Sequence, residues 1–144
     1  MATQIFVNLP VKDLKKSIAF FSQIGFTFNQ QFTDDTAACM VISDHIYAML
    51  LTHEKFSQFT PKKIADTSQS TEVLNALSFD SKEKVNEAVD KAIGAGATEA
   101  REPINYGFMY GRSFNDLDGH IWEFFWMDPA TVQQEQPVHE TSLN

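Results

Sequence analysis

The chemistry available to this chain depends on a few polar side chains that interrupt apolar stretches. Glu123 is the only charged residue between Ile121 and Met127. Alternation along a strand would place Glu123 with Ile121 and Phe125 on one face. A carboxylate held beneath a ligand can act as an acid, a base or a hydrogen-bond anchor. Glu123 is therefore the predicted catalytic residue, and the structural alternative is a pairing of Glu123 with Arg112 or with a backbone group.

Two other stretches carry side chains that are suited to holding a ligand. Near the N-terminus, alternation places Phe6 and Asn8 on one face, which makes the Asn8 amide a hydrogen-bonding candidate beside Glu123 unless neighbouring strands satisfy it. Further along, Tyr110 and Arg112 share a face, and an arginine between aromatic rings can hold a carboxylate or a phosphate. The sequence does not determine which face of the sheet this second pair occupies. The predicted ligand-binding residues are Phe6, Asn8, Tyr110, Arg112 and Glu123.

The histidines and the single cysteine predict no metal-ligand cluster. His45 and His120 precede two corresponding strands, so both are interpreted as structural, and His53 as a surface residue. His139 lies in a polar tail that carries no predicted function. Cys39 is the only cysteine, which excludes an internal disulfide and favours a reducing compartment. We expect a buried, unreactive thiol at Cys39 and a cytoplasmic location for the protein.

Length and composition favour one soluble domain. A chain of 144 residues with 43% hydrophobic residues can bury a core of its own. The formal net charge of −8 argues against nucleic acid binding, which needs clustered Lys and Arg. No run of about 18 apolar residues occurs, and the N-terminus lacks a basic segment before an apolar one. Neither membrane spanning nor secretion is therefore expected.

The elements that must position these side chains are predicted to occur in the same order twice. Residues 5–9 predict a strand, and Asp13 can cap a helix whose apolar side chains recur at helical spacing as far as Gly25. Three strand-like runs follow at residues 26–32, 37–42 and 46–52. The first module, about residues 4–59, is therefore predicted as β, α, β, β, β, and the polar residues 60–71 as a linker.

The second half of the chain repeats this pattern. A strand is predicted at residues 73–79, after which Asp80 and Glu83 resemble a capping box and a helical stripe continues to Gly94. Three more strands are predicted at residues 98–101, 108–115 and 121–127. The second module, about residues 72–128, therefore has the same order β, α, β, β, β.

The two modules align in residues as well as in pattern. Asp44-His45-Ile46 aligns with Gly119-His120-Ile121, 75 positions later, whereas the first strands align 68 positions apart. We therefore predict seven extra residues in the second module, in a loop near residues 103–110. Residues 1–130 are predicted to form a single α+β domain, and residues 131–144 a flexible tail.

Three segments carry a resemblance to a known family. They are Phe6-Val7-Asn8-Leu9-Pro10-Val11-Lys12-Asp13-Leu14, Phe20-Phe21-Ser22-Gln23-Ile24-Gly25-Phe26 and Asp116-Leu117-Asp118-Gly119-His120-Ile121-Trp122-Glu123. Together they resemble the vicinal oxygen chelate superfamily, which includes glyoxalase I, extradiol dioxygenases, and fosfomycin- and bleomycin-resistance proteins, and most of all its predicted lactoylglutathione-lyase-like subgroup. The resemblance implies that the two βαβββ modules form a curved mixed sheet around a cleft.

The resemblance also identifies the positions of metal ligands. In metal-dependent members, each module supplies one ligand from its first strand and one from its fourth. The corresponding positions here are Asn8 and Ala48 in the first module and Ala76 and Glu123 in the second. Only Glu123 is a good ligand for the Zn, Ni, Fe or Mn ions that such enzymes use. This departure predicts no metal site and no cofactor, with one divalent metal as the alternative.

The predicted function is metal-independent binding of a small molecule in the cleft, as in the bleomycin-resistance members. Two alternatives stay open. One is a divalent-metal-dependent, lactoylglutathione-lyase-like enzyme, or another lyase or isomerase, which would need a metal bound through Glu123, Asn8 and an unexpected residue such as His53. The other is a non-catalytic assembly module. The resemblance further implies a homodimer, and neither nucleic acid nor a membrane is an expected partner.

Overall fold

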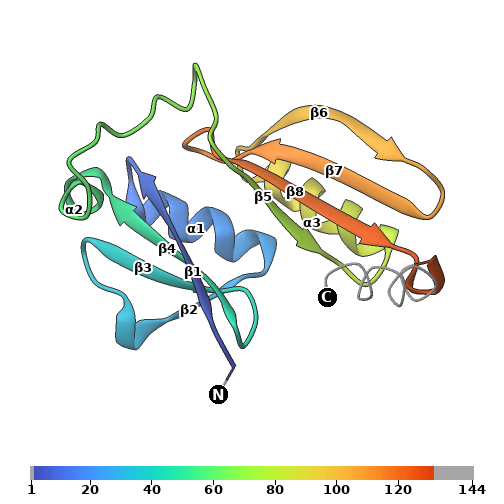
Figure 1. Cartoon of the computed structure of the whole chain (residues 1–144), viewed down its shortest axis with the longest axis horizontal. Helices are drawn as coiled ribbons and strands as arrows, with labels where there is room; N and C mark the ends of the chain where they lie inside the picture. The colour runs from blue at the N-terminus through green and yellow to red at the C-terminus, as the bar shows by residue number, and fades with distance from the viewer. Residues whose placement is uncertain (1, 132–144) are drawn as a thin grey trace, which may run out of the picture.

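The computed structural model describes residues 2–131 and contains both predicted modules (Figure 1). The first module consists of β1 (Ile5–Val11), α1 (Leu14–Ile24), β2 (Thr27–Asn29), the 3₁₀ turn η1 (Gln30–Phe32), β3 (Ala37–Val41), β4 (Ile46–Thr52) and the short helix α2 (His53–Ser57). The second consists of β5 (Leu74–Ser78), α3 (Lys82–Gly94), β6 (Thr98–Asn105), β7 (Met109–Asn115) and β8 (Ile121–Met127). The predicted flexible tail lies outside the described residues except for Thr131.

Local hydrogen bonds account for the start of the two long helices. The side chain of Asp13 accepts a hydrogen bond from a backbone N–H in the first turn of α1, as predicted. In α3 the same role belongs to Ser81, so the predicted capping box of Asp80 and Glu83 is wrong. The extended backbone of Ser81, with φ of −157° and ψ of 162°, directs its hydroxyl toward the first turn. Among the described residues, no helix is long and apolar enough to cross a membrane.

The eight strands form two four-stranded mixed sheets, in the orders β1-β4-β3-β2 and β5-β8-β7-β6. In each sheet the first strand runs parallel to the fourth, and the other neighbours are antiparallel. This arrangement confirms the predicted fold class of two βαβββ modules. The single curved sheet that the resemblance implied is replaced by two sheets, because β1 and β5 are both edge strands and no ladder joins them in the described part of the chain.

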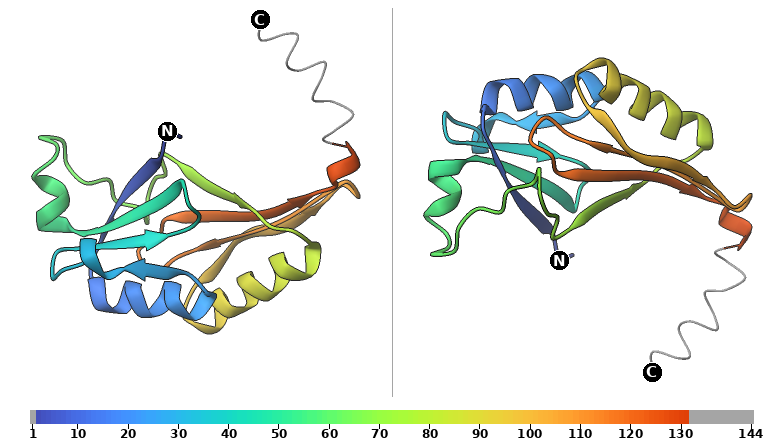
Figure 2. Two further views of the ribbon diagram at one scale, coloured as in Figure 1. Left: turned by 90° about the horizontal axis from the view of Figure 1, so that it is seen from below. Right: turned by 90° about the horizontal axis from the view of Figure 1, so that it is seen from above.

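One hydrophobic core spans both modules. The helices α1 and α3 lie on the same side of the two sheets and contact each other (Figure 2). Two aromatic rings of α1 reach the second module, where Phe20 lies 6.2 Å from Phe114 and Phe21 lies 5.4 Å from Trp122, measured between ring centroids. All four side chains are buried. Burial of these rings across the boundary stabilises the two modules as one unit.

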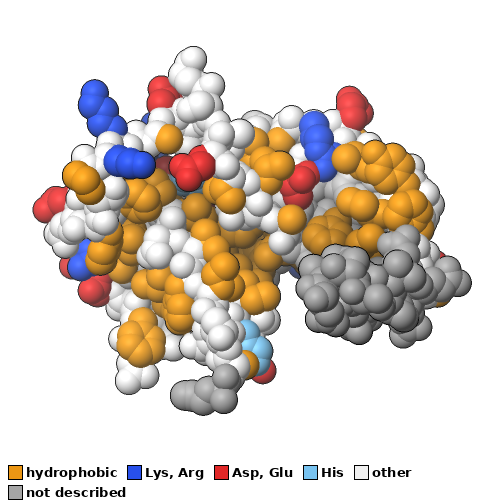
Figure 3. Space-filling model, in the orientation of Figure 1, with side chains coloured by type: hydrophobic (Ala, Val, Ile, Leu, Met, Phe, Trp, Pro, Cys, Tyr) orange, Lys and Arg blue, Asp and Glu red, His pale blue; other side chains and the backbone are white. Residues whose placement is uncertain are grey.

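The long helices α1 and α3 leave the opposite side of both sheets, here called the open face, largely uncovered in the described residues, and only the short helix α2 and the linker cover one end of it (Figure 2). Alternation places Phe6 and Asn8 of β1 on this face, and Glu123 and Phe125 of β8, as predicted. Figure 3 looks onto the open face and shows hydrophobic side chains gathered over the first sheet and between the two sheets. The open face is therefore apolar over much of its extent.

The turns before β4 and β8 show how the two modules correspond. In the first module Val41 pairs with Tyr47 across the turn, and in the second Asn115 pairs with Ile121. Each turn therefore encloses the same number of residues, 42–46 in one and 116–120 in the other. Tyr47 thus corresponds to Ile121, and the predicted alignment, which matched two histidines, is wrong by one residue.

This shift changes which residue of β4 lies on the open face. Ala48, the predicted counterpart of Glu123, is fully buried on the helix side of the sheet. Met49 is the true counterpart, because it lies opposite Asn8 in the ladder as Glu123 lies opposite Ala76. The prediction of Ala48 at this position is therefore wrong. The four central positions of the open face are Asn8, Met49, Ala76 and Glu123.

The additional length of the second module is divided between two places. The helix caps Asp13 and Ser81 lie 68 positions apart. After each helix, the N–H of Phe26 or Ala97 bonds to a carbonyl five residues earlier, and these two residues lie 71 positions apart. The fourth strands lie 74 positions apart. Three residues are therefore added by the end of α3 and three within the hairpin of β6 and β7, where β6 contains two register shifts, which corrects the predicted single loop of seven.

Candidate functional site

Two adjoining cavities open beside Asn8 on the first module. One has a volume of about 370 Å³ and is lined by β1 and the linker. The other has a volume of about 460 Å³ and is lined by β4, α2 and the residues that follow α2. Asn8, Phe56 and Thr60 line both cavities, which together are called the Asn8 groove below. Cavities of this size bind small organic molecules.

The short helix α2 forms the aromatic wall of the groove. It begins directly after β4, where Thr52 Oγ1 accepts a hydrogen bond from Lys55 N at 3.2 Å. This cap turns the chain back against β1 and β4, both of which α2 contacts. Phe56 is consequently half-buried and lines both cavities, while the more exposed Phe59 lines the second.

The linker forms the opposite wall and is fastened to the second module. Thr67 Oγ1 donates a hydrogen bond to the carbonyl oxygen of Asp118, in the turn between β7 and β8. Within the linker, Asp66 accepts hydrogen bonds from Ser68 Oγ at 2.6 Å and from Ser68 N at 3.0 Å. These hydrogen bonds lower the pKa of Asp66 below its usual value. The linker therefore has a defined path over the groove, although its composition is that of a loop.

A third cavity, of about 720 Å³, shares Thr67 and other linker residues with the groove. His53, predicted to lie at the surface, lines this cavity and not the groove. Polar groups here join the modules, since Asp118 accepts hydrogen bonds from Lys12 N at 2.8 Å and from Ser17 Oγ at 3.4 Å. We assign this cavity to the contact between modules, because its acidic groups are already used within the fold.

Asp116 is a buried carboxylate at the same boundary. It accepts hydrogen bonds from Trp122 Nε1 at 2.9 Å and from the backbone N–H groups of Asp118, at 2.9 Å, and His120, at 3.0 Å. Burial raises the pKa of Asp116 in spite of these donors. His120 Nε2 donates to the carbonyl of Pro10 at 2.7 Å and so joins the second module to β1. This hydrogen bond confirms the structural role predicted for His120.

Glu123 lies on the open face of the second sheet and does not line the groove. Its carboxylate pairs with Arg101 of β6, and not with Arg112, the partner that the structural alternative assumed. Ser113 stands between the two in the ladder and is almost fully buried. The side chains of Arg101 and Glu123 are 35% and 21% exposed, so the ion pair is accessible to solvent.

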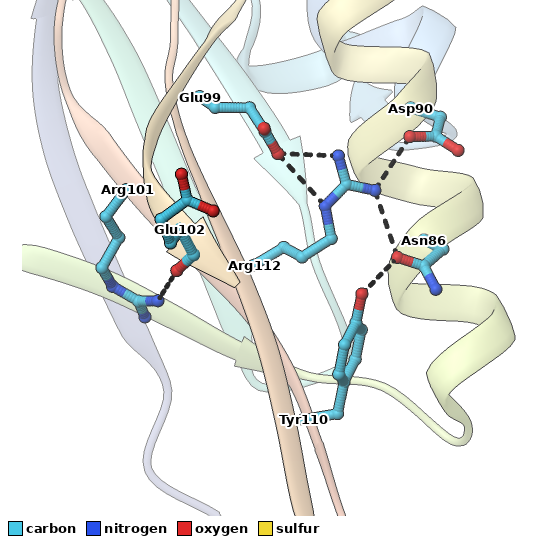
Figure 4. A network of polar contacts seen from close by, with 7 residues as sticks. All are labelled: Asn86, Asp90, Glu99, Arg101, Glu102, Tyr110 and Arg112. Carbon is cyan, nitrogen blue, oxygen red and sulfur yellow. Dashed lines mark hydrogen bonds and ion pairs between the residues drawn. The ribbon is translucent and has the colours of Figure 1, made fainter. Parts of the chain in front are cut away.

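Tyr110 and Arg112 lie on the helix side of β7 and so point away from the open face (Figure 4). Arg112 donates hydrogen bonds to Asp90 and Glu99, each at 2.8 Å, and to Asn86 at 3.1 Å. Tyr110 Oη donates to Asn86 Oδ1 at 2.8 Å. Burial alone would lower the pKa of Arg112, but its two carboxylate partners raise it above the usual value. The network joins α3 to the sheet, and the structure does not bring these two predicted ligand-binding residues to the groove.

Of the predicted site residues, Asn8 lines the groove, whereas Phe6 lies two residues away on the same face and does not line it. Phe6 stacks on Tyr47 with ring centroids 4.7 Å apart and an interplanar angle of 9°. The Asn8 amide nitrogen donates to the carbonyl of Phe6 at 3.2 Å. Sequence reasoning missed Phe56 and the linker wall. The signal that could have found them is the pair of phenylalanines in the polar stretch after β4.

Comparisons with known proteins agree with this architecture. Residues 3–43 match the family model described as bleomycin resistance protein-like N-terminal. A glyoxalase/bleomycin resistance protein/dioxygenase family enzyme from Burkholderia phytofirmans is similar in structure, with a TM-score of 0.73 and 21% identity over 88% of this chain and 99% of that one. The chain has the glyoxalase/bleomycin-resistance fold.

Other solved structures share this glyoxalase/bleomycin-resistance fold. A hypothetical protein from S. aureus is 29% identical over 88% of this chain and 95% of that one, with a TM-score of 0.73. A genomically encoded fosfomycin resistance protein from Listeria monocytogenes is 21% identical over 88% and 91% of the two chains, with a TM-score of 0.63. A search of curated proteins found no match. These findings show the fold, and membership of the vicinal oxygen chelate superfamily and of its lactoylglutathione-lyase-like subgroup stays a prediction.

The donor set of this member of the fold does not fit a divalent metal ion. Of the four central open-face positions, Ala76 has no donor, Met49 offers a thioether and Asn8 a neutral amide. The carboxylate of Glu123 is already engaged in an ion pair. Burial raises the pKa of the Cys39 thiol, which disfavours the thiolate that binds metals. Within residues 2–131, no group of three His, Cys, Asp or Glu side chains could hold a metal ion.

Proposed function

We propose that this protein binds a small organic molecule in the Asn8 groove without the help of a metal ion. The observation that carries the proposal is the position of Asn8 at the junction of two adjoining cavities. Its carboxamide can donate and accept hydrogen bonds, while Leu51 and Phe56 supply apolar surface beside it. A few orienting polar groups in an otherwise apolar groove are typical of small-molecule sites.

The residues at the central open-face positions support binding without a metal. Chelation of a substrate by a metal needs about three protein ligands that leave an open position. The set here contains one carboxylate, Glu123, which is paired with Arg101. Glu123 also lies outside the groove. Its predicted catalytic role therefore belongs only to the alternative function, in which a lyase or isomerase would act on the open face of the second sheet.

Thermal unfolding in the presence of EDTA tests the proposal. We expect compounds from a library of small organic molecules to raise the Tm of the wild-type protein, because ligands that bind only the folded state stabilise it. Asn8→Ala should reduce these shifts. Gln23→Ala is the matched control, since it removes an exposed amide from α1, and it should leave the shifts unchanged.

Elemental analysis of protein purified without chelators separates this proposal from the alternatives. About one Zn, Ni, Mn or Fe ion per chain, with stabilisation by ligands only after metal is added back, would contradict it. That result would favour a divalent-metal-dependent, lactoylglutathione-lyase-like enzyme or another lyase or isomerase. A protein with neither metal nor stabilising ligand would favour the non-catalytic assembly module.

We also propose that the protein forms a homodimer through the open face. β1 and β5 are edge strands, and large apolar side chains on or just before them are 46% to 54% exposed: Phe6 and Leu74 on the open face, and Ile5 and Val73 next to them at the strand edges. Exposed edges and apolar patches of this kind mark association surfaces. A second copy is the simplest partner, because each chain presents both edges and a two-fold axis can pair them.

A further inference from the structure

Positive charge collects in two segments of this acidic chain, residues 12–16 and residues 54–63, and the second borders the Asn8 groove. The protein has 19 acidic and 11 basic residues, which gives the net charge of −8. Residues 54–63, which include most of α2 and the start of the linker, nevertheless contain three lysines and a single carboxylate. Figure 3 shows basic side chains beside hydrophobic ones over α2 and the beginning of the linker, at the upper left. The reversal of charge coincides with the wall of the Asn8 groove.

Two of these lysines line the groove itself. Lys62 and Lys63 contribute to the wall of the 370 Å³ cavity together with Asn8. Neither forms an ion pair within residues 2–131. Glu72 is the one carboxylate of the described residues that lines the groove. Cationic groups that lack an internal counter-ion at a concave site attract an anion.

The adjoining cavity supplies an apolar surface. Leu51, Phe56 and Phe59 line its 460 Å³. The third lysine of the segment, Lys55, has its Nζ 5.7 Å from the centroid of the Phe59 ring, and this cation–π contact holds the ring beside the cavity. A ligand that uses both cavities therefore needs an apolar body and an anionic group.

We infer that the ligand is a small organic carboxylate with an aromatic or aliphatic body. Lys62 and Lys63 attract the carboxylate, the side chains of α2 pack against the body, and Asn8 orients the molecule at the junction of the two cavities. This inference rests on the proposed function and adds the chemical class of the ligand to it. The net negative charge of the chain disfavours non-specific binding of anions, so the lysines of the groove can act selectively.

Titration with 1-naphthoate and 1-naphthamide separates the charge of such a ligand from its apolar body. The two compounds share one ring system and differ in a carboxylate against a neutral amide. Binding is followed by ¹H–¹⁵N NMR, with the side-chain amide of Asn8 and the backbone amides of Phe56 and Lys63 as reporters. We expect both compounds to shift these signals, and naphthoate to bind about tenfold more tightly, as two partly exposed charge pairs allow.

A matched pair of double variants tests the lysines. Lys62→Ala/Lys63→Ala removes two exposed side chains and should weaken naphthoate binding about tenfold, to the level of naphthamide, without changing naphthamide binding. Lys15→Ala/Lys16→Ala removes the same charge from an exposed part of α1 and should leave naphthoate binding unchanged.

Four outcomes would overturn the inference. Equal affinity for the two compounds at the same reporters would exclude the carboxylate class while the groove and the proposed function stand. Equal weakening in both double variants would assign the preference to net charge and not to Lys62 and Lys63. If neither compound shifts the reporters, the groove does not bind apolar anions. Shifts confined to the second sheet around Glu123 would place the binding site there and contradict the proposed function as well.

Discussion

Asp116 shows at the scale of one residue how opposing effects set a protonation state. Three N–H donors favour the ionised carboxylate, whereas its burial favours the protonated form. Burial has the larger effect, and the pKa of Asp116 lies above its usual value of 3.8. Ionisation of Asp116 is therefore a cost to the folded protein that its hydrogen bonds only partly offset.

A carboxyl ¹³C NMR titration should place the pKa of Asp116 above 3.8. Between 3.8 and that raised value, the folded protein binds more protons at this site than the unfolded chain does. The contribution of Asp116 to stability is consequently complete below pH 3.8 and is lost as the pH rises through the folded-state pKa. A midpoint at or below 3.8 would mean that the three donors outweigh burial.

Arg112 should matter for stability and not for ligand binding. Its side chain is 13% exposed and joins α3 to β6 and β7 through Asp90 and Glu99. We expect Arg112→Met to lower the free energy of unfolding in urea by about 1–3 kcal/mol, because these charge-assisted hydrogen bonds are lost. Arg101→Met, which breaks the more exposed pair with Glu123, should cost about 1 kcal/mol or less.

A ligand-binding experiment tests whether Arg112 also contributes to binding, as the sequence predicted. A variant Arg112→Met that keeps the stability of the wild type but loses ligand-induced thermal stabilisation would restore Arg112 as a ligand-binding residue. The expected outcome is the reverse, since the guanidinium group faces α3 and not the groove (Figure 4).

At the scale of elements, the linker depends on the turn between β7 and β8. Gly119 in this turn has a φ of +87°, which glycine adopts without strain. Its lack of a side chain also lets the linker approach closely, because a Cβ at this position would lie 2.6 Å from Thr67 Oγ1. One glycine thus affects both the shape of the turn and the path of the linker, which forms a wall of the groove on the first module.

Gly119→Ala and Gly107→Ala separate these two roles. Both glycines have positive φ, but a Cβ at Gly107 would meet nothing within 4 Å. We expect Gly107→Ala to lower the free energy of unfolding by about 1 kcal/mol, from backbone strain alone. Gly119→Ala should cost a further 1 kcal/mol or so and should shift the NMR signals of Thr67 and its linker neighbours. Equal losses in the free energy of unfolding for the two variants would show that the linker can move away from a Cβ at position 119 without a cost in stability.

At the scale of the whole molecule, the fold covers one side of its sheets and leaves the other uncovered. Both long helices and the aromatic core lie on the helix side, where rings of α1 pack against the second module. The open face has no equivalent layer in the described residues, although much of it is apolar (Figure 3). Stacking of layers around a core normally hides such a face, so a second layer is expected from association.

Light scattering coupled to size-exclusion chromatography should give the mass of a dimer for the wild-type protein. Phe6→Lys together with Leu74→Lys should shift it toward the monomer, because charges would be buried at the proposed contact. Phe32→Lys is the matched control, since Phe32 is 62% exposed in η1, next to β2 at the opposite edge of the first sheet from β1, and should leave the dimer intact. A monomeric wild type would contradict the proposed association.

The sequence by itself determined the features that depend on neighbours along the chain. Helical spacing and turn residues predicted the βαβββ order, and the cap at Asp13 follows from a hydrogen bond three residues away. Strand alternation predicted correctly that Asn8 and Glu123 lie on the open face. These predictions succeeded because the periods of strands and helices are local properties of the backbone.

Only the tertiary structure decided which side chains meet. The faces of Tyr110 and Arg112, the pairing of Glu123 with Arg101, and the counterpart Met49 all depend on residues that are distant in sequence. The Asn8 groove likewise needs a linker whose path is set by a turn of the other module. A polar side chain pairs with whichever group the packing of helices and sheets brings near it, and packing depends on contacts that no local period encodes.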